Sequence, residues 1–137
     1  MSEPRQKLMS IIGKDGCYLL SLVYCAEKFT RQRIDAVEVY EKAVSNGMME
    51  RNCFVIQPDA IMQMMTGRRW GIRHDTSFYR PKDNEYMIMR YETSVINKTY
   101  SHFVVCAPDG SVEYDPFGAS STVRDGKAVS SRILTLL

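Results

Sequence analysis

The sequence predicts an α+β protein in which helices come first and an antiparallel sheet follows. Cys17 to Phe29 is apolar on almost every side, which is typical of a helix buried in the centre of a domain. After Gly71 the pattern changes to alternating apolar and polar residues, the period of two that indicates strands. Helical segments followed by strand segments favour a sheet packed against the interior helix. We therefore expect one domain, residues 1–137, in which the helix that carries Cys17 lies on a C-terminal antiparallel sheet.

Two shorter helices are predicted after the interior one. Asp35 and Glu38 have the spacing of a capping box, which begins a helix, and Asn46-Gly47 supplies a left-handed end. A further helix is predicted from Asp59 to Thr66, directly after a proline and before Gly67.

Four strands are predicted from alternation and turn residues. Asp125-Gly126 is typical of a two-residue hairpin between the last pair of strands. Arg68-Arg69-Trp70-Gly71 is interpreted as a break between the helices and the sheet. The predicted strands are Tyr86 to Tyr91, Tyr100 to Ala107, Ser111 to Asp115 and Ala128 to Leu136.

Composition excludes several classes of protein. Apolar residues make up 45% and charged residues 25%, which argues against disorder, and the formal charge of +2 indicates no strong attraction to nucleic acid or to a membrane. No apolar run approaches the roughly 18 residues that span a bilayer, and the first residues have no export pattern. We expect a cytoplasmic protein that binds neither nucleic acid nor membrane, and the sequence has no signal for its oligomeric state.

One basic cluster includes an aromatic residue: Arg68, Arg69, Trp70, Arg73 and His74. A short cluster in a nearly neutral chain is more typical of a solvated turn than of a nucleic-acid site. A second interpretation is that the stretch borders the cleft and contacts an acidic substrate.

Four cysteines are present, and in a reducing compartment we expect them as free thiols. Cys25 is expected to point into the core. Cys53 and Cys106 could be zinc ligands together with His74, but the spacings typical of zinc sites are missing. We therefore predict no metal and no cofactor.

Cys17 is the candidate nucleophile because it stands where the interior helix begins. A cysteine attacks as the thiolate, and a helix N-terminus beside an imidazole lowers the pKa of the thiol. Gly16 has no Cβ, so a substrate carbonyl could approach the backbone closely there. The unpaired N–H groups of the first turn, that of Cys17 included, could hold the oxyanion.

His102 and Asp115 are the candidate base and orienter. His102 opens an apolar strand, and Asp115 lies at the far end of the next one, before Pro116. With a two-residue loop at Asp109-Gly110, His102 opposes Phe117 and lies diagonally to Asp115 on one face. With a three-residue loop the parity reverses, and the two side chains meet only if a β-bulge intervenes. The triad hypothesis therefore predicts either the shorter loop or a bulge.

These blocks resemble a known superfamily. Gly16-Cys17-Tyr18-Leu19-Leu20-Ser21-Leu22, Ser101-His102-Phe103-Val104-Val105 and Glu113-Tyr114-Asp115-Pro116-Phe117-Gly118 are similar to papain-like cysteine peptidases of the bacteriocin-processing (C39-like) type. The layout also resembles a small bacterial and prophage family. The resemblance implies a papain-like fold, with Cys17 as nucleophile, His102 as general base and acid, and Asp115 as orienter.

The oxyanion donor departs from the superfamily pattern. The superfamily places a glutamine several residues before the cysteine, whereas here Gln6 lies 11 residues upstream. Gln6 and the Cys17 backbone are the candidate donors. Asp15 is expected to cap the helix through its carboxylate, which would occupy an N–H group that the oxyanion needs.

Two functions stay open from the sequence. The first is a cysteine peptidase or amide hydrolase that acts on a peptide or on a cell-wall peptide bond through Cys17, His102 and Asp115. The second is a non-catalytic papain-like pseudoenzyme that serves as a binding or phage-associated accessory protein. Asp15 and the distant glutamine favour the second.

Overall fold

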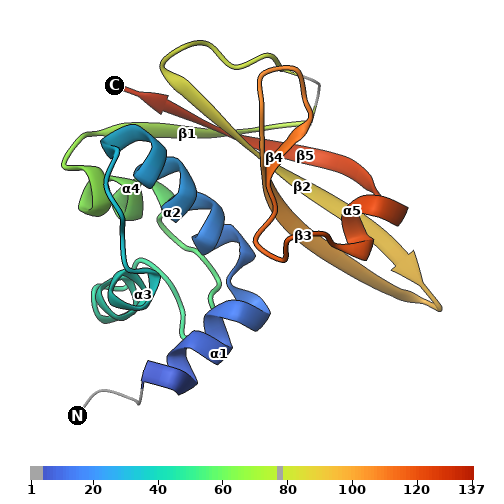
Figure 1. The fold of residues 1–137 in the computed structure, drawn as a ribbon, viewed down its shortest axis with the longest axis horizontal. Helices are drawn as coiled ribbons and strands as arrows, with labels where there is room; N and C mark the ends of the chain where they lie inside the picture. The colour runs from blue at the N-terminus through green and yellow to red at the C-terminus, as the bar shows by residue number, and fades with distance from the viewer. Residues whose placement is uncertain (1–4, 77–78) are drawn as a thin grey trace.

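The computed structural model describes residues 5–76 and 79–137, and its described part confirms the predicted α+β class (Figure 1). Four helices come first: α1 (Arg5–Asp15), α2 (Cys17–Thr30), α3 (Ala36–Ser45) and α4 (Pro58–Thr66). The remaining elements are the strands β1 (Trp70–Asp75), β2 (Glu85–Val95), β3 (Lys98–Cys106), β4 (Val112–Tyr114) and β5 (Lys127–Leu136), with the short helix α5 (Ser121–Asp125) before β5.

The strands form one antiparallel sheet in the order β1-β5-β2-β3-β4. The last strand of the chain, β5, thus lies between β1 and β2. Figure 1 shows α1 to α4 on one side of the sheet and α5 on the other. The sheet therefore has one broad face covered by α1 to α4 and a second face on which α5 packs.

Alternation along the strands sends side chains to these two faces. Ile88, Val105 and Leu134 belong to the large core that the sheet shares with the helices. Their neighbours Met87, Val104 and Ile133 form a smaller cluster on the opposite face, where Val123 of α5 packs. His102 has the parity of Val104, so its side chain lies on the face opposite to α2.

Helix α2 is the interior helix that the sequence predicts. Leu19, Leu22, Cys25 and Ala26 have no solvent exposure, which confirms the expected position of Cys25 in the core. The helix ends at Arg31, which takes the left-handed conformation and donates its backbone N–H to the Glu27 carbonyl.

The two following helices also confirm the sequence prediction. Asp35 caps α3 by accepting from the Val37 N–H at 3.0 Å, and Gly47 beyond the helix has a φ of 73°. Helix α4 has Pro58 in its first turn and ends at Gly67, which is left-handed as well. Local signals were sufficient for these boundaries.

Two predictions about the strands were wrong. Residues Trp70–Asp75 form β1 instead of a loop, because all six of them pair with β5 near the other end of the chain. Asp125-Gly126 is not a hairpin, because α5 precedes it and β5 pairs with β1 and β2. Gly126 is required there for close packing, since a Cβ would overlap the carbonyl oxygens of Glu92 and Thr122.

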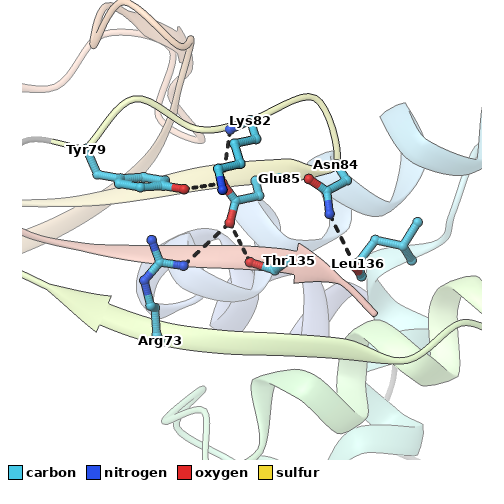
Figure 2. Close-up of polar contacts among 7 residues, drawn as sticks. All are labelled: Arg73, Tyr79, Lys82, Asn84, Glu85, Thr135 and Leu136. Carbon is cyan, nitrogen blue, oxygen red and sulfur yellow. Dashed lines mark hydrogen bonds and ion pairs between the residues drawn. The ribbon is translucent and has the colours of Figure 1, made fainter.

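A polar network fastens the start of β2 to its surroundings (Figure 2). The Glu85 carboxylate accepts hydrogen bonds from the Tyr79 hydroxyl, the Lys82 N–H and the Thr135 hydroxyl, and forms an ion pair with Arg73. Burial alone would raise the pKa of Glu85, but these donors hold it at about 2. The network joins β1, β2, β5 and the segment before β2.

No single helix in residues 5–76 and 79–137 has the length and apolar character needed to cross a membrane. Helices α1 and α2 meet these criteria only as a pair, and that pair is bent by 98°.

Candidate active site

A sharp elbow between α1 and α2 places Cys17 at a helix N-terminus. Gly16 forms the elbow and donates its backbone N–H to the Ile12 carbonyl at 2.8 Å. A Cβ at Gly16 would lie 2.5 Å from that same carbonyl oxygen, so only glycine fits. The missing Cβ therefore makes room for α1 and not, as expected from the sequence, for a substrate carbonyl.

The expected side-chain cap on this helix was wrong. Asp15 is the last residue of α1, and Gly16 is the N-cap of α2 and makes no side-chain capping hydrogen bond. The first hydrogen bond of α2 runs from the Leu20 N–H to the Gly16 carbonyl. The N–H groups of Cys17 and Tyr18 are thus left without a helical acceptor, as helix N-termini require.

His102 and Asp115 are joined directly. The distance from His102 Nε2 to Asp115 Oδ1 is 2.6 Å, and the two side chains are only 2% and 5% exposed. The same carboxylate oxygen accepts from the Phe117 N–H at 2.8 Å, and the Phe117 ring stacks on the imidazole at 4.3 Å. The ring is therefore fixed from its edge and from one face.

A β-bulge brings the two side chains to the same face. Cys106 pairs with Val112, but Val105 pairs with Tyr114, so one extra residue of β4 lies between these pairs. Continued past Tyr114, this register sets Asp115 opposite Val104 and Phe117 opposite His102. The structure thus confirms the bulge, one of the two alternatives that the triad hypothesis predicted.

The remaining ring nitrogen of the histidine has no partner among the described residues. His102 Nδ1 is buried and has no hydrogen-bond partner in the described part of the chain. Burial would raise the pKa of Asp115, but the His102 ring and the Phe117 N–H keep it lower than usual. An ionised Asp115 holds the proton of a neutral ring on Nε2, which leaves Nδ1 as an unprotonated acceptor.

Cys17 meets β3 next to this histidine. Strand β4 pairs with β3 only at Val105 and Cys106, and α2 contacts β3 at Phe103. Ser21 Oγ donates to the Phe103 carbonyl at 3.5 Å, and Tyr18 stacks on the Phe103 ring at 4.6 Å. The Phe103 N–H lies near enough to lower the pKa of the Cys17 thiol, and that nitrogen is two bonds from the His102 Cα. Cys17 thus lies at the edge of β3, beside the backbone of the residue that follows His102, while the His102 side chain lies on the face opposite to α2.

The electrostatics of Cys17 differ from the expectation. Burial raises the pKa of the thiol, and the backbone N–H groups of Phe103, Tyr18 and Cys17 lower it by less. The charge of Asp115 raises it further, which shows that the carboxylate lies within electrostatic range. The predicted lowering of the pKa was therefore wrong for this state, because a half-buried thiol loses solvation. Among the described residues, no hydrogen bond joins Cys17 to His102.

Gln6 is not an oxyanion donor. It is an exposed residue in the first turn of α1, ten residues before Gly16. Ten helical residues span roughly 15 Å, which is more than the length of a glutamine side chain. The backbone N–H of Cys17 stays available for this role.

A cavity of about 310 Å³ opens beside Cys17. Phe54 and Ile56, which are 63% and 49% exposed, line it together with Phe103. His74 of β1 and Arg132 of β5 also line it. A larger cavity of about 570 Å³ lies between α1 and α3, but it contains no member of the triad.

The sequence indicated His74 as a candidate for this cavity but did not reveal Arg132. Arg132 lies in β5, and the alternation of apolar and polar residues there does not indicate a cavity. It lies opposite His74 because β1 pairs with β5. Of the basic cluster, Trp70 points into the core and Arg73 into the Glu85 network, so His74 is the member that lines the cavity. One residue of the cluster thus borders the cavity, as the second interpretation expected, and a contact with an acidic substrate stays a prediction.

The other three cysteines are buried, whereas Cys17 is half-buried. Burial raises the pKa of Cys25 strongly and that of Cys53 and Cys106 to about 11, while Cys53 also lines the Cys17 cavity. Within residues 5–76 and 79–137, no group of three or more histidine, cysteine or acidic side chains has the arrangement of a metal site.

Comparison with known proteins gives one match. Residues 1–136 match the family described as "Protein of unknown function, DUF261", and the chain therefore belongs to that family. No curated protein and no solved structure matches the chain.

Proposed function

We propose that this member of the DUF261 family is a papain-like cysteine hydrolase that cleaves an amide bond in a peptide or a cell-wall peptide. Cys17 is the nucleophile, His102 the general base and acid, and Asp115 the residue that orients the ring. The observation that carries the proposal is the buried pair of His102 and Asp115, which leaves Nδ1 of His102 without a partner among the described residues. The backbone N–H of the next residue, Phe103, lies near enough to lower the pKa of Cys17.

The first half of the reaction forms a thioester. Nδ1 of His102 takes the proton of the Cys17 thiol, and the thiolate attacks the carbonyl carbon of the substrate. The negative charge that develops on the carbonyl oxygen is held by the Cys17 N–H at the helix N-terminus. The C–N bond then breaks, and the leaving amine takes the proton from the His102 ring.

The second half regenerates the enzyme. His102 takes a proton from water, the resulting hydroxide attacks the thioester, and the C–S bond breaks. The acid is released and the proton returns to the Cys17 sulfur. Asp115 keeps its negative charge throughout and stabilises the imidazolium that forms twice.

The cavity beside Cys17 has a border suited to a peptide substrate. The exposed apolar side chains of Phe54 and Ile56 stand at its border, a surface suited to the apolar parts of a peptide. Their segment follows Cys53, which has a φ of 72°, a rare conformation for a residue with a side chain.

The non-catalytic alternative is favoured by one observation. The pKa of Cys17 is raised, and its thiol has no hydrogen bond to His102 in this state of the protein. A pseudoenzyme that uses the cavity only for binding would show the same features.

Site-resolved alkylation separates the two functions. The wild-type protein and the variants His102→Ala and Asp115→Asn are treated with iodoacetamide at neutral pH, and labelling of each cysteine is followed by peptide mass spectrometry. The hydrolase predicts that Cys17 reacts faster than Cys25, Cys53 and Cys106 by at least about tenfold. It also predicts that His102→Ala removes this advantage.

The pseudoenzyme predicts a different pattern. Labelling of Cys17 at the rate of the other cysteines, or a rate unchanged in His102→Ala, would remove the case for a nucleophile. Circular dichroism of each variant shows whether the fold is retained.

A further inference from the structure

The cavity beside Cys17 contains a cation without an acidic partner. The guanidinium of Arg132 lies 5.0 Å above the Phe103 ring and 6.0 Å from the Tyr18 ring, and it donates from Nη1 to the Ser130 hydroxyl at 2.7 Å. Its Nε is buried and has no hydrogen-bond partner. Among the described residues, no carboxylate pairs with Arg132, whereas the neighbouring Arg90 pairs with Glu92.

A second buried donor lies next to it. The Tyr18 hydroxyl is buried and has no hydrogen bond of normal geometry within the described part of the chain, and it lies beside the Arg132 guanidinium, whose charge and side-chain contact lower its pKa. Burial raises the pKa of Tyr18 to about 12, so the hydroxyl keeps its proton at neutral pH. Tyr18 directly follows Cys17, so this donor is close to the nucleophile.

The other titratable groups of the cavity are few. His74 faces Arg132 across the β1–β5 pairing, and burial together with the Arg132 charge lowers its pKa, so its ring is neutral at neutral pH. Asp15 lies at the exposed border of the cavity, where solvent screens its charge. Cys53 is neutral because its pKa is raised to about 11.

We propose that this cavity binds a carboxylate of the substrate, held by Arg132 and Tyr18, so that the hydrolase acts next to an acidic group. The inference rests on the proposed function and names the substrate class of the same site. A buried donor without a partner costs free energy, and so does a half-buried guanidinium that has no anionic partner. A carboxylate satisfies both, because it offers two oxygens to the flat guanidinium fork and to a hydroxyl.

The proposal requires this carboxylate close to the scissile carbonyl. Cys17, Tyr18 and Arg132 line one cavity of about 310 Å³, which is at the lower limit of small-ligand sites. The apolar border at Phe54 and Ile56 then contacts the remainder of the peptide.

A pair of alkylating reagents tests the charge preference. Iodoacetate and iodoacetamide differ only in a carboxylate, and the ratio of their rates at Cys17, divided by the same ratio for glutathione, measures recognition of the charge. The pair 3-iodopropionate and 3-iodopropionamide extends the reach by one carbon. We expect Arg132→Met to lower the ratio about tenfold. We expect Tyr18→Phe, which keeps the stack on Phe103, to lower it about threefold.

Arg124→Met is the matched control. Arg124 is an exposed arginine of α5, on the other side of the sheet, so this variant removes the same charge without changing the cavity. Its ratio is expected to equal that of the wild type. Tyr18→Phe supplies the test if Arg132→Met does not fold.

The outcomes separate this inference from the proposed function. If iodoacetamide does not single out Cys17, the hydrolase itself fails. If Cys17 is singled out but the acid-to-amide ratio is the same in the wild type, Arg132→Met and Tyr18→Phe, only the carboxylate subsite is overturned.

Protection experiments identify the source of the carboxylate. N-acetylglutamate α-amide carries it on a side chain, N-acetylalanine carries it at a C-terminus, and N-acetylglutamine α-amide is the neutral control. Slower labelling of Cys17 with either acid supports the inference and identifies the source. Equal labelling with all three compounds contradicts it.

Discussion

The elbow at Gly16 sets the position of Cys17, the proposed nucleophile, and the substitution of Gly16 by alanine tests it. In Gly16→Ala the added Cβ would lie 2.5 Å from the Ile12 carbonyl oxygen and 3.0 Å from the Ile12 Cα. Both are backbone atoms of α1, so relief requires α1 and α2 to separate. The φ of −99° at Gly16 is accessible to alanine, so the cost arises from overlap alone.

Gly13 offers the same substitution without the overlap. It lies inside α1, is exposed, and a Cβ there would meet nothing within 4 Å. Gly13→Ala is expected to stabilise the protein by about 0.5–1 kcal/mol, because alanine favours the helix over the unfolded chain. Gly16→Ala is expected to destabilise it by about 1–3 kcal/mol, the usual cost of overpacking. The two variants should thus differ by about 2–4 kcal/mol.

Urea denaturation, followed by circular dichroism, measures this difference. Iodoacetamide labelling of Cys17 under native conditions reports the position of the thiol, and we expect it to slow in Gly16→Ala and to stay unchanged in Gly13→Ala. Equal stability of the two variants would refute the close approach of α1 to Gly16. Unchanged labelling in a destabilised Gly16→Ala would show that the elbow does not position the nucleophile.

Three further predictions concern other parts of the molecule. Glu85→Gln is expected to lower the free energy of unfolding at pH 6. The fall in the pKa of Glu85 from 4.5 to about 2 sets an upper bound of about 3 kcal/mol on this loss. Solvent screening reduces the expected loss to about 1–2 kcal/mol. Because the pKa of Glu85 is lower in the folded state, its contribution is complete above about pH 5 and is lost as the pH falls towards 2. The urea midpoints of the wild type and of Glu85→Gln should therefore converge at low pH. Asp83→Asn, at an exposed position, is the control and is expected not to converge in this way. Asp115→Asn is expected to slow labelling of Cys17 at least tenfold, since a neutral amide no longer fixes the ring proton on Nε2; a wild-type rate would exclude Asp115 as orienter. Gln6→Ala is expected to leave that rate unchanged, and a clear decrease would restore Gln6 as a candidate donor.

Local sequence patterns predicted the elements that carry the triad. The apolar run from Cys17, the His102 strand and the turn before Asp115 each depend on neighbours in the chain, so their positions could be read from the residues. The bulge that aligns His102 with Asp115 was one of two predicted possibilities, because loop length alone did not fix the register.

Features that depend on distant contacts could not be predicted in this way. Strand β1 forms because its six residues pair with β5, and that pairing also brings His74 to Arg132 in the cavity. The direction of the Cys17 pKa was wrong for the same reason, since burial is set by the packing of α2 against β3 and not by the helix start. Gln6 was too far away because residues 5–15 form one helix, which their mixed composition did not predict.

The coupling of the Cys17 thiol to the His102 ring is the central claim, and the pH dependence of Cys17 alkylation measures it most directly. The rate is followed from pH 5 to pH 10 in the wild type and in His102→Ala. We predict that the wild-type rate rises at a clearly lower pH, because the ring accepts the proton that the buried thiol loses, whereas the variant follows a lone thiol with a raised pKa. Superimposable profiles would contradict the claim.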